Sequence, residues 1–223
     1  MALGATGWRL GLTGRDTAGL AETARLAEAA GAPETWTVAG NLAGPDAATA
    51  IATVSSLFGT AADRWGGLDL LFNNAGTGRV ATLAETDDAL WDATIALNLT
   101  APMRCCRAAL PLFAAAGGGL IINNASVAAT RGFPGFTAYC AAKAGLLGFS
   151  RALREEARGD GVRVAVLLPG ATATDIWDSL GGEWDRTKMI QADDLARLVV
   201  AMADAPANVL VEELTIMPAS GAL

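Results

Sequence analysis

Short apolar runs alternate with longer helical patterns along this chain, and that alternation constrains the fold more than any other feature. The apolar runs have the length of β-strands and cover residues 9–12, 35–39, 68–73, 120–124, 162–168 and 209–217. Runs such as LDLLF and VRVAVLL are apolar at nearly every position, as expected when helices cover both faces of a parallel sheet. The helical patterns cover residues 17–30, 46–64, 86–115, 137–158 and 192–205, and the third is expected to break near Asn98. The alternation predicts an α/β fold with a doubly wound parallel sheet.

The length of the chain predicts a single domain. Its 223 residues suffice for one sizeable core, and no linker, repeat or low-complexity tract divides them. We therefore expect residues 1–223 to form one Rossmann-type domain, with a polar, glycine-containing stretch at residues 175–188 as its least regular segment.

Composition removes several classes of function. The chain contains no histidine, which excludes Ser-His-Asp hydrolysis, Cys-His proteolysis and most zinc chemistry. Its net charge of −7 argues against nucleic acid or an anionic membrane as the main partner. The cysteines Cys105, Cys106 and Cys140 lack metal-ligand spacing, so no metal site is expected.

Cysteine usage and hydropathy also predict the location of the protein. An odd number of cysteines without a signal peptide fits a reducing cytosol. The longest apolar stretch, residues 108–122, is interrupted by Pro111 and by glycines and is too short to span a bilayer. The sequence thus predicts a soluble, cytoplasmic protein.

The only tyrosine of the chain, Tyr139, stands four residues before one of its two lysines, Lys143, at the start of a predicted helix. The two side chains share one helix face, and the lysine ammonium is expected to lower the tyrosine pKa from its usual value of about 10. Such a phenol donates a proton to a carbonyl oxygen or accepts one from an alcohol. Ser126 ends the strand LIINNAS, at the carboxyl end where open α/β sheets bind ligands, so its hydroxyl can hold the substrate oxygen. A Tyr–Lys pair at this spacing often only decorates a helix, but the scarcity of both residue types and the position of Ser126 favour catalysis.

These residues, in the segment YCAAK and at Ser126, and the run NNAG at residues 73–76 resemble the signature set of the classical short-chain dehydrogenase/reductase family. The resemblance extends from about Gly7 to the C-terminus. It implies an NAD(P)-dependent oxidoreductase that transfers hydride between a nicotinamide and a carbonyl or secondary alcohol, with Tyr139 as general acid/base. It also implies that Asn98 is a fourth catalytic residue, which supports a proton relay through Lys143.

The same resemblance implies the residues that line the cofactor. Lys143 hydrogen-bonds the nicotinamide ribose, beside Tyr139. The run after strand LDLLF lines the adenosine side, with Asn74, Ala75 and Gly76. The turn PGxxxT packs on the nicotinamide and holds its carboxamide, with Pro169, Gly170, Thr172 and Thr174.

The substrate side is less defined by the sequence. The loop at residues 130–137 is expected to line the pocket, with Phe133 and Phe136 as an apolar wall. Trp177 and Trp184 lie in the stretch 175–188, where the family carries its substrate lid, although they can equally be core or subunit-contact residues. The C-terminal strand resembles the carbonyl-reductase-like branch. The resemblance further implies a homodimer or homotetramer.

Two interpretations of the N-terminus remain open. Family members begin with a strand and a TGxxxGxG turn that holds the cofactor pyrophosphate at a helix N-terminus. In the first interpretation, residues 13–21 are a degenerate form of that turn. In the second, residues 9–12 are the family's second strand and residues 2–7 are the tail of its first helix. The interval from Gly14 to the pair Asn41-Leu42, which resembles the family's adenine-contacting pair, favours the second.

Under the second interpretation Arg15 follows the second strand and can hold a 2′-phosphate, so NADP(H) is favoured over NAD(H), unless Arg15 is a solvated loop cation. The first strand and its phosphate loop are then missing from the sequence, and we expect a fragment or a misplaced start codon. That strand lies in the middle of the family's sheet, and its neighbours would expose unpaired backbone groups without it. The alternative to an enzyme is a non-catalytic or fragmentary relative that has lost dinucleotide binding.

Overall fold

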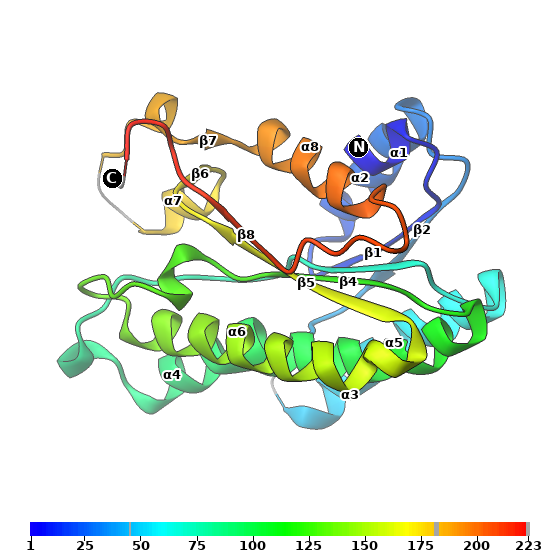
Figure 1. Cartoon of the computed structure of the whole chain (residues 1–223). Helices are drawn as coiled ribbons and strands as arrows, with labels where there is room; N and C mark the ends of the chain where they lie inside the picture. Colours follow the sequence, from blue (N-terminus) through cyan, green and yellow to red (C-terminus); the bar gives the residue numbers. More distant parts are fainter. Residues whose placement is uncertain (45, 181–182, 222–223) are drawn as a thin grey trace.

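The computed structural model describes residues 1–44, 46–180 and 183–221, which form a layer of parallel strands with helices on both faces (Figure 1). The strands are β1 (Leu10–Gly14), β2 (Thr35–Ala39), β3 (Leu70–Asn73), β4 (Gly119–Asn124), β5 (Val162–Pro169), β6 (Thr172–Ala173), β7 (Ile190–Gln191) and β8 (Glu213–Ile216). The α-helices are α1 (Ala2–Ala5), α2 (Thr17–Ala29), α3 (Ala47–Trp65), α4 (Asp88–Ile95), α5 (Ala101–Ala116), α6 (Thr137–Ala157), α7 (Ile176–Leu180) and α8 (Ala192–Ala203). The short helical turns are η1 (Leu83–Glu85), η2 (Ala96–Thr100), η3 (Val127–Ala129), η4 (Arg158–Asp160) and η5 (Arg186–Lys188).

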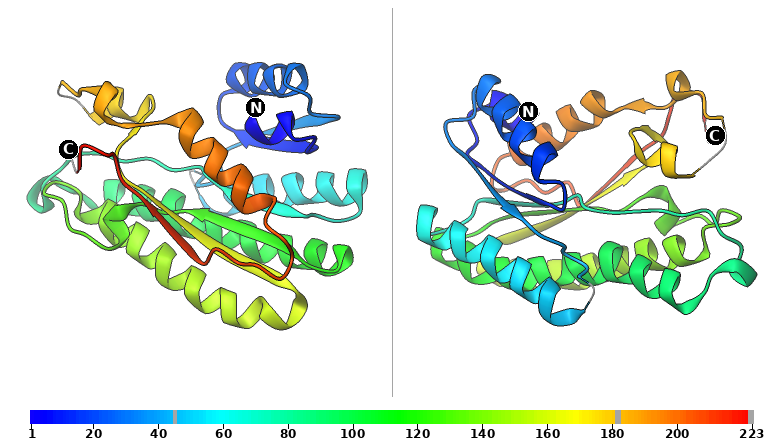
Figure 2. Two further views of the ribbon diagram at one scale, coloured as in Figure 1. Left: turned by 45° about the horizontal axis from the view of Figure 1, so that its top comes forward. Right: turned by 180° about the vertical axis from the view of Figure 1, so that it is seen from behind.

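Two helical layers enclose the strands. Helices α3, α4, α5 and α6 cover one face, and α1, α2 and α8 cover the other (Figures 1 and 2). Alternate residues of β4 and β5 enter separate hydrophobic clusters on the two faces: Ile121 and Val164 on one, Ile122 and Ala165 on the other. This two-sided burial explains why these strands are apolar at nearly every position. The predicted doubly wound α/β architecture is confirmed.

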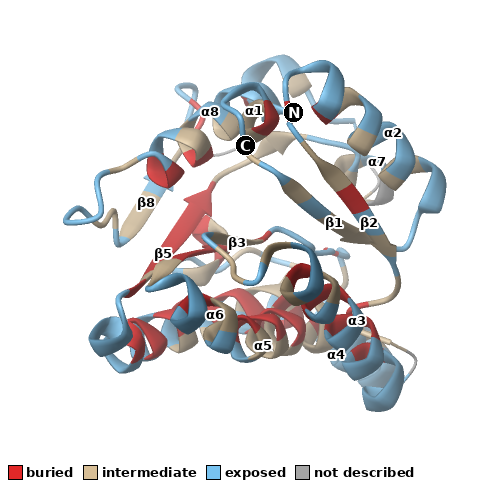
Figure 3. Cartoon of the chain, turned by 90° about the vertical axis from the view of Figure 1, so that its right-hand side faces the viewer, coloured by how far each residue is buried: buried red, intermediate tan, exposed pale blue. Residues whose placement is uncertain are grey.

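The strands do not form one continuous sheet. β1 pairs in parallel with β2, while β3, β4, β5 and β8 form a separate four-stranded parallel sheet in that order. Within the described ranges β1 has no ladder to β3, and the two sheets lie apart in Figure 3. A cleft of about 480 Å³ lies between them. This is the order that the second interpretation of the N-terminus predicts, with α1 as the helix that precedes the second strand.

The boundaries of the helices follow from local sequence signals. Asp16 begins α2 by accepting a hydrogen bond from the N–H of Ala18, and Asp46 begins α3 by accepting one from Thr49, at 2.7 Å. Helix α3 ends at Gly66, whose φ of 70° lies in the left-handed region that favours glycine. The helix expected at residues 86–115 breaks where predicted, because η2 around Asn98 is a π-helical turn between α4 and α5.

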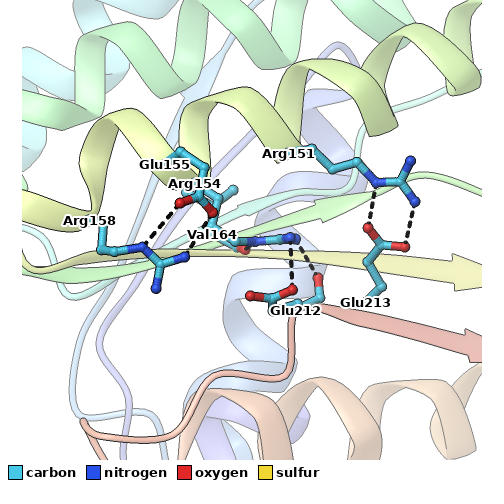
Figure 4. A network of polar contacts seen from close by, with 7 residues as sticks. All are labelled: Arg151, Arg154, Glu155, Arg158, Val164, Glu212 and Glu213. Atoms are coloured by element: carbon cyan, nitrogen blue, oxygen red, sulfur yellow. Dashed lines mark hydrogen bonds and ion pairs between the residues drawn. The ribbon is translucent and has the colours of Figure 1, made fainter.

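A buried arginine connects α6 to the sheet through hydrogen bonds (Figure 4). Arg154 is 5% exposed, and it donates to the main-chain carbonyls of Val164 and Glu212, each at 2.8 Å. Its guanidinium also lies 3.3 Å from the Glu212 carboxylate. The neighbouring Arg151 forms an exposed ion pair with Glu213 at 2.7 Å. Together these contacts fix the start of β8 against β5.

The structure differs from the sequence prediction in a few elements. The strand expected at residues 209–217 shortens to Glu213–Ile216; in the segment before it, the carbonyls of Pro206 and Val209 accept hydrogen bonds from the Arg163 side chain. The stretch 175–188 contains α7 and η5, which the sequence did not indicate; residues 181 and 182 lie outside the described ranges. In the described part of the chain, each helix is too short or too polar to cross a bilayer.

Candidate active site

The candidate residues from distant parts of the chain meet at one edge of the strand layer. Because the strands are parallel, their carboxyl ends share this edge, where ligands bind in open α/β sheets. Ser126 follows β4, and the first turns of α6 bring Tyr139 and Lys143 beside it. Asn98 reaches the same place from η2. The structure therefore brings together all four residues to which the sequence assigned catalysis.

Lys143 lies deep beneath Tyr139 on the same face of α6. Its side chain is buried, with the residue 3% exposed, and its Nζ donates to the carbonyl of Asn124 at 2.8 Å. The same nitrogen lies 5.6 Å from the centroid of the Tyr139 ring. The i, i+4 spacing thus places the ammonium next to the phenol and ties it to the end of β4.

Asn98 is fully buried and connects α4 to the loop after β3. Its Nδ2 donates to the carbonyls of Thr77, at 2.9 Å, and Thr94, at 3.0 Å, and its Oδ1 accepts from the N–H of Thr77 at 3.3 Å. A Cβ at Gly76 would lie 2.9 Å from Asn98 Oδ1 and 3.6 Å from Lys143 Nζ. Glycine at this position therefore leaves room for the approach of these two polar groups. The sequence did not indicate the role of Thr77 and Thr94, whose contacts use main-chain atoms.

Ser126 is held in place by its own loop. Its Oγ accepts from the N–H of Ala128 at 3.1 Å, which starts η3, and donates to the carbonyl of Pro169 at 3.4 Å. Ser126 also interacts with the Tyr139 side chain in the direction that lowers the pKa of the phenol. The serine hydroxyl and the phenol are therefore close enough to contact one substrate oxygen.

Burial dominates the titration of the two ionisable groups. Loss of water lowers the pKa of Lys143 from 10.5 to about 8. It also raises the pKa of Tyr139 above its ordinary value, and the hydrogen bond from Ser126 opposes that rise only in part. The tyrosine pKa is therefore raised, whereas the sequence led us to expect that it is lowered. The physical reason is that removal of the phenolate from water is the largest effect, and Lys143 is not among the groups that offset it.

The loop after β3 is exposed, and an unsatisfied hydrogen-bond acceptor lies beside it at the end of β4. Asn74, Ala75 and Gly76 are exposed, and Asn74 Oδ1 accepts from the side-chain amide of Asn124 at 2.8 Å. The Oδ1 of Asn124 is buried and has no hydrogen-bond partner among the described residues. A buried acceptor without a partner at this edge is a group that a bound ligand or water can satisfy.

The residues that the sequence assigned to the adenine and to the 2′-phosphate lie directly after the strands of the two-stranded sheet. Asn41 and Leu42 follow β2; Asn41 Oδ1 accepts from the N–H of Ala43, and Leu42 is buried in the cleft wall. Arg15 follows β1 and is exposed. The carboxylate of Asp16 occupies the N-terminus of α2, so this turn is not a phosphate loop, contrary to the first interpretation.

The turn after β5 is closely packed around its glycine. The N–H of Gly170 donates to the carbonyl of Ile216 at 2.7 Å, and a Cβ at Gly170 would lie 2.9 Å from Pro218. Thr172 and Thr174 point back into the turn, and their hydroxyls donate to the carbonyls two residues earlier at 3.1 and 3.5 Å. This segment continues into β6, which pairs with β7.

Helix α7 lies next to the candidate catalytic tyrosine. A Cβ at the buried Gly78 would be 3.8 Å from both Leu180 and the Tyr139 ring and 3.9 Å from Ile176. Trp177 donates from Nε1 to the carbonyl of Thr172 at 2.7 Å, and its ring packs on Trp184 at a centroid distance of 4.7 Å. The sequence did not single out Gly78, although it stands two residues after the NNAG run.

A nicotinamide dinucleotide would find suitable groups at two places. Near Lys143, the unsatisfied acceptor on Asn124 and the open surface at Gly76 lie together and would suit its nicotinamide end. After β1, the exposed Arg15 guanidinium would offer a cation for a phosphate. In the part of the chain that the structure describes, the N-terminus of α2 is already capped and offers no cradle of amides for the pyrophosphate.

Comparison with known proteins identifies the family. A family model described as short chain dehydrogenase matches residues 1–183. The 3-oxoacyl-[acyl-carrier-protein] reductase of a Synechocystis strain is 34% identical over 183 residues, which are 82% of this chain and 72% of that protein. A metagenomic short-chain oxidoreductase solved with NADP superposes with a TM-score of 0.82 at 32% identity, over 97% of this chain and 88% of the other. L-Sorbose reductase from Gluconobacter frateurii, solved with NADPH and L-sorbose, gives 0.87 at 27% identity, over 100% and 89%.

The chain therefore belongs to the short-chain dehydrogenase family, a class of oxidoreductases that use a nicotinamide dinucleotide and small-molecule substrates. It spans about half the length of several other curated relatives that it matches. The Rossmann-type fold expected from the sequence agrees with this membership.

Proposed function

We propose that this protein is an NADP(H)-dependent oxidoreductase that interconverts a small carbonyl compound and the corresponding secondary alcohol, with Tyr139 as general acid/base. The observation that carries the proposal is the convergence of Ser126, Tyr139, Lys143 and Asn98 at one edge of the sheet, although they come from three separate segments of the chain. When bound, the nicotinamide supplies or accepts the hydride.

Tyr139 and Ser126 handle the oxygen of the substrate. The raised pKa of Tyr139 keeps the phenol protonated at neutral pH, so it is ready to give its proton to a carbonyl oxygen as that oxygen gains charge. The bond from Ser126 Oγ to Pro169 is long, at 3.4 Å, and is readily exchanged for one to the same substrate oxygen. In the oxidative direction the phenolate form would remove the proton from the alcohol.

Lys143 and Asn98 return the proton to the tyrosine. With a pKa of about 8, Lys143 is protonated at neutral pH yet gives up its proton easily. Asn98 Oδ1 and Lys143 Nζ both lie beside Gly76, where a bridging water can connect them to solvent. The fully buried Asn98 then positions this relay through its bonds to Thr77 and Thr94.

Substrate and assembly are proposed from the surroundings of the tyrosine. The Phe136 ring packs edge-on against the Tyr139 ring, with ring centroids 6.1 Å apart, and Ile176 and Leu180 of α7 lie nearby. We therefore expect the substrate to place an apolar group beside the tyrosine. We propose that the segment 175–188 acts as a lid over this group. By family membership we also propose a homodimer or homotetramer, which light scattering can check.

Nucleotide binding and one substitution test the proposed activity. We expect NADPH to raise the melting temperature of the chain in a concentration-dependent manner, and more strongly than NADH. Tyr139→Phe should keep this shift while NADPH oxidation with small ketones and aldehydes falls by about 10²- to 10⁴-fold. Equal turnover by the variant would exclude the proposed acid/base role. No shift with either nucleotide would favour the alternative, a non-catalytic relative.

Cofactor preference has its own test. Arg15→Ser should weaken NADPH binding by about tenfold and leave NADH binding unchanged, because only NADPH carries the 2′-phosphate. Arg25→Ser on α2, where the arginine pairs with Glu22, is the matched control that removes the same charge elsewhere. Equal weakening by both variants would show a general charge effect and would contradict a specific contact.

A further inference from the structure

Two consecutive asparagines end β4, and they differ in how their side-chain amides are satisfied. Asn123 is fully buried; its Oδ1 accepts from Asn73 and its Nδ2 donates to Ser150, each at 2.8 Å. Asn124 donates from Nδ2 to Asn74 Oδ1, also at 2.8 Å, but its own Oδ1 is buried and lacks a hydrogen-bond partner among the described residues. A buried acceptor without a donor is unfavourable, so a donor from outside the chain is expected there.

The open acceptor belongs to the residue that also holds Lys143. The main-chain carbonyl of Asn124 accepts from Lys143 Nζ at 2.8 Å, and an ammonium has three N–H donors, of which this contact uses one. Gly76 is exposed, and a Cβ on it would lie 3.6 Å from the same nitrogen. This edge of the sheet therefore combines an acceptor, a cationic donor and an opening to solvent.

The hydrogen-bonding character of the acceptor selects the part of a ligand that can lie against it. It repels phosphate and carboxylate oxygens, which only accept, and it attracts hydroxyl and amide N–H groups, which donate. In a nicotinamide dinucleotide the donors are the ribose hydroxyls, the carboxamide and the adenine amino group. The sequence assigns the carboxamide to the turn after β5 and the adenine to the segment after β2. The ribose next to the nicotinamide is thus the part that suits this position.

We propose that Asn124 is a further cofactor-contacting residue, whose side-chain oxygen accepts a hydrogen bond from one hydroxyl of the nicotinamide ribose while Lys143 donates to the neighbouring hydroxyl. A ribose presents two adjacent hydroxyls, so one can donate to an amide oxygen while the other accepts from an ammonium. The inference rests on the proposed function, because it requires that the chain binds a nicotinamide dinucleotide.

Such a contact has opposite effects on the free and the bound protein. Without ligand, the unsatisfied oxygen of Asn124 destabilises the fold, and an apolar side chain of similar size removes that penalty. With ligand, the same substitution leaves the ribose hydroxyl without its acceptor. A loss of affinity together with a gain in stability is therefore expected of a binding residue, and not of a residue that only supports the fold.

Melting temperatures and NADPH titrations of three variants test the inference without any assay of turnover. Asn124→Leu removes the acceptor at nearly the same side-chain volume, whereas Asn124→Asp keeps an oxygen at the same position. Asn208→Leu is the matched control, because this asparagine is exposed in the segment between α8 and β8. Each chain is titrated with NADPH and with analogues that lack either hydroxyl of the nicotinamide ribose, and tryptophan fluorescence reports binding.

Without ligand, Asn124→Leu should melt about 2–4 °C above the wild type, and it should bind NADPH about tenfold more weakly. Removal of one of the two ribose hydroxyls should weaken binding to the wild type by about tenfold, and its effect on Asn124→Leu should be at least about threefold smaller. Asn124→Asp should bind NADPH within about threefold of the wild type, and Asn208→Leu should match the wild type in both properties.

Four other results would count against the inference. Unchanged NADPH affinity in Asn124→Leu would overturn it and leave the proposed function in place. Equal losses in the leucine and aspartate variants would overturn it as well, because the unsatisfied group would then be a donor. A leucine variant that binds more weakly and is also less stable would show a structural role instead. A folded wild type that binds no NADPH would overturn the proposed function, and this contact with it.

Discussion

Replacement of Lys143 by methionine should make the protein more stable while it abolishes the proposed chemistry. The residue is 3% exposed, and its ammonium donates a hydrogen bond to the carbonyl of Asn124. A pKa lowered from 10.5 to about 8 means that burial penalises the ammonium by about 3 kcal/mol relative to the neutral amine. Methionine removes this penalty, and loss of the bond to Asn124 costs about 1 kcal/mol. The expected net gain at pH 7 is about 2 kcal/mol in the free energy of unfolding.

The sign of the pH dependence follows from which state holds the proton. Between pH 8 and 10.5 the unfolded chain binds the lysine proton and the folded chain does not, so stability of the wild type rises with pH across that window. Below pH 8 both states are protonated and the whole penalty remains. The advantage of Lys143→Met should therefore shrink by about 2 kcal/mol between pH 7 and pH 9.5.

Urea unfolding at these two pH values measures the difference directly. The buried thiols of Cys105 and Cys106, whose pKa values burial raises to about 12, destabilise the fold above pH 9, but they do so equally in both chains and cancel. Lys188→Met is the matched control, because the other lysine is exposed, and its effect should stay within about 0.5 kcal/mol at both pH values. A Lys143→Met variant that is less stable than wild type at pH 7, by an amount that does not change with pH, would refute the reasoning.

Two further substitutions test packing at the site and behind it. Gly76→Ala should destabilise the fold by about 1–3 kcal/mol and lower turnover, because the added Cβ would lie 2.9 Å from Asn98 Oδ1. An unchanged melting temperature and unchanged activity would contradict this steric explanation. Arg154→Met should lower the free energy of unfolding by about 2–4 kcal/mol, because it leaves two main-chain carbonyls without their donor. Arg151→Met, which removes the exposed ion pair, should lower it by less than about 1 kcal/mol. Similar losses in the two arginine variants, measured by urea unfolding, would show that burial of the hydrogen bonds is not what matters.

Hydrophobic pattern was sufficient to predict the main elements of the fold. The bounds predicted for β2 are the observed ones, and the long helix breaks near Asn98 as predicted. Both predictions use the spacing of apolar residues along the chain, which differs between strands and helices. The short elements α7, β6 and β7 were not predictable in this way, since they depend on contacts such as Trp177 with Thr172 rather than on a periodic pattern. The segment before β8 is likewise held by a residue from another strand, since Arg163 of β5 donates to the carbonyl of Val209.

Electrostatics at the site was the least predictable property. Sequence spacing correctly placed Lys143 beside Tyr139, but it did not show that Lys143 is deeply buried and Tyr139 half-buried. This removal from water raises the tyrosine pKa, opposite to the expected direction. The spacing argument treats the pair as if it were in water, where the attraction between ammonium and phenolate decides the outcome. In the folded protein the cost of removing each charge from water decides it instead.

The division of the strands also divides the proposed active site. Ser126, Tyr139 and Lys143 lie on the four-stranded sheet side, after β4 and on α6, whereas Arg15 and Asn41 follow the strands of the two-stranded sheet. Proton chemistry needs only the first group, but a dinucleotide must contact both, so its affinity depends on how firmly the two sheets are held relative to one another.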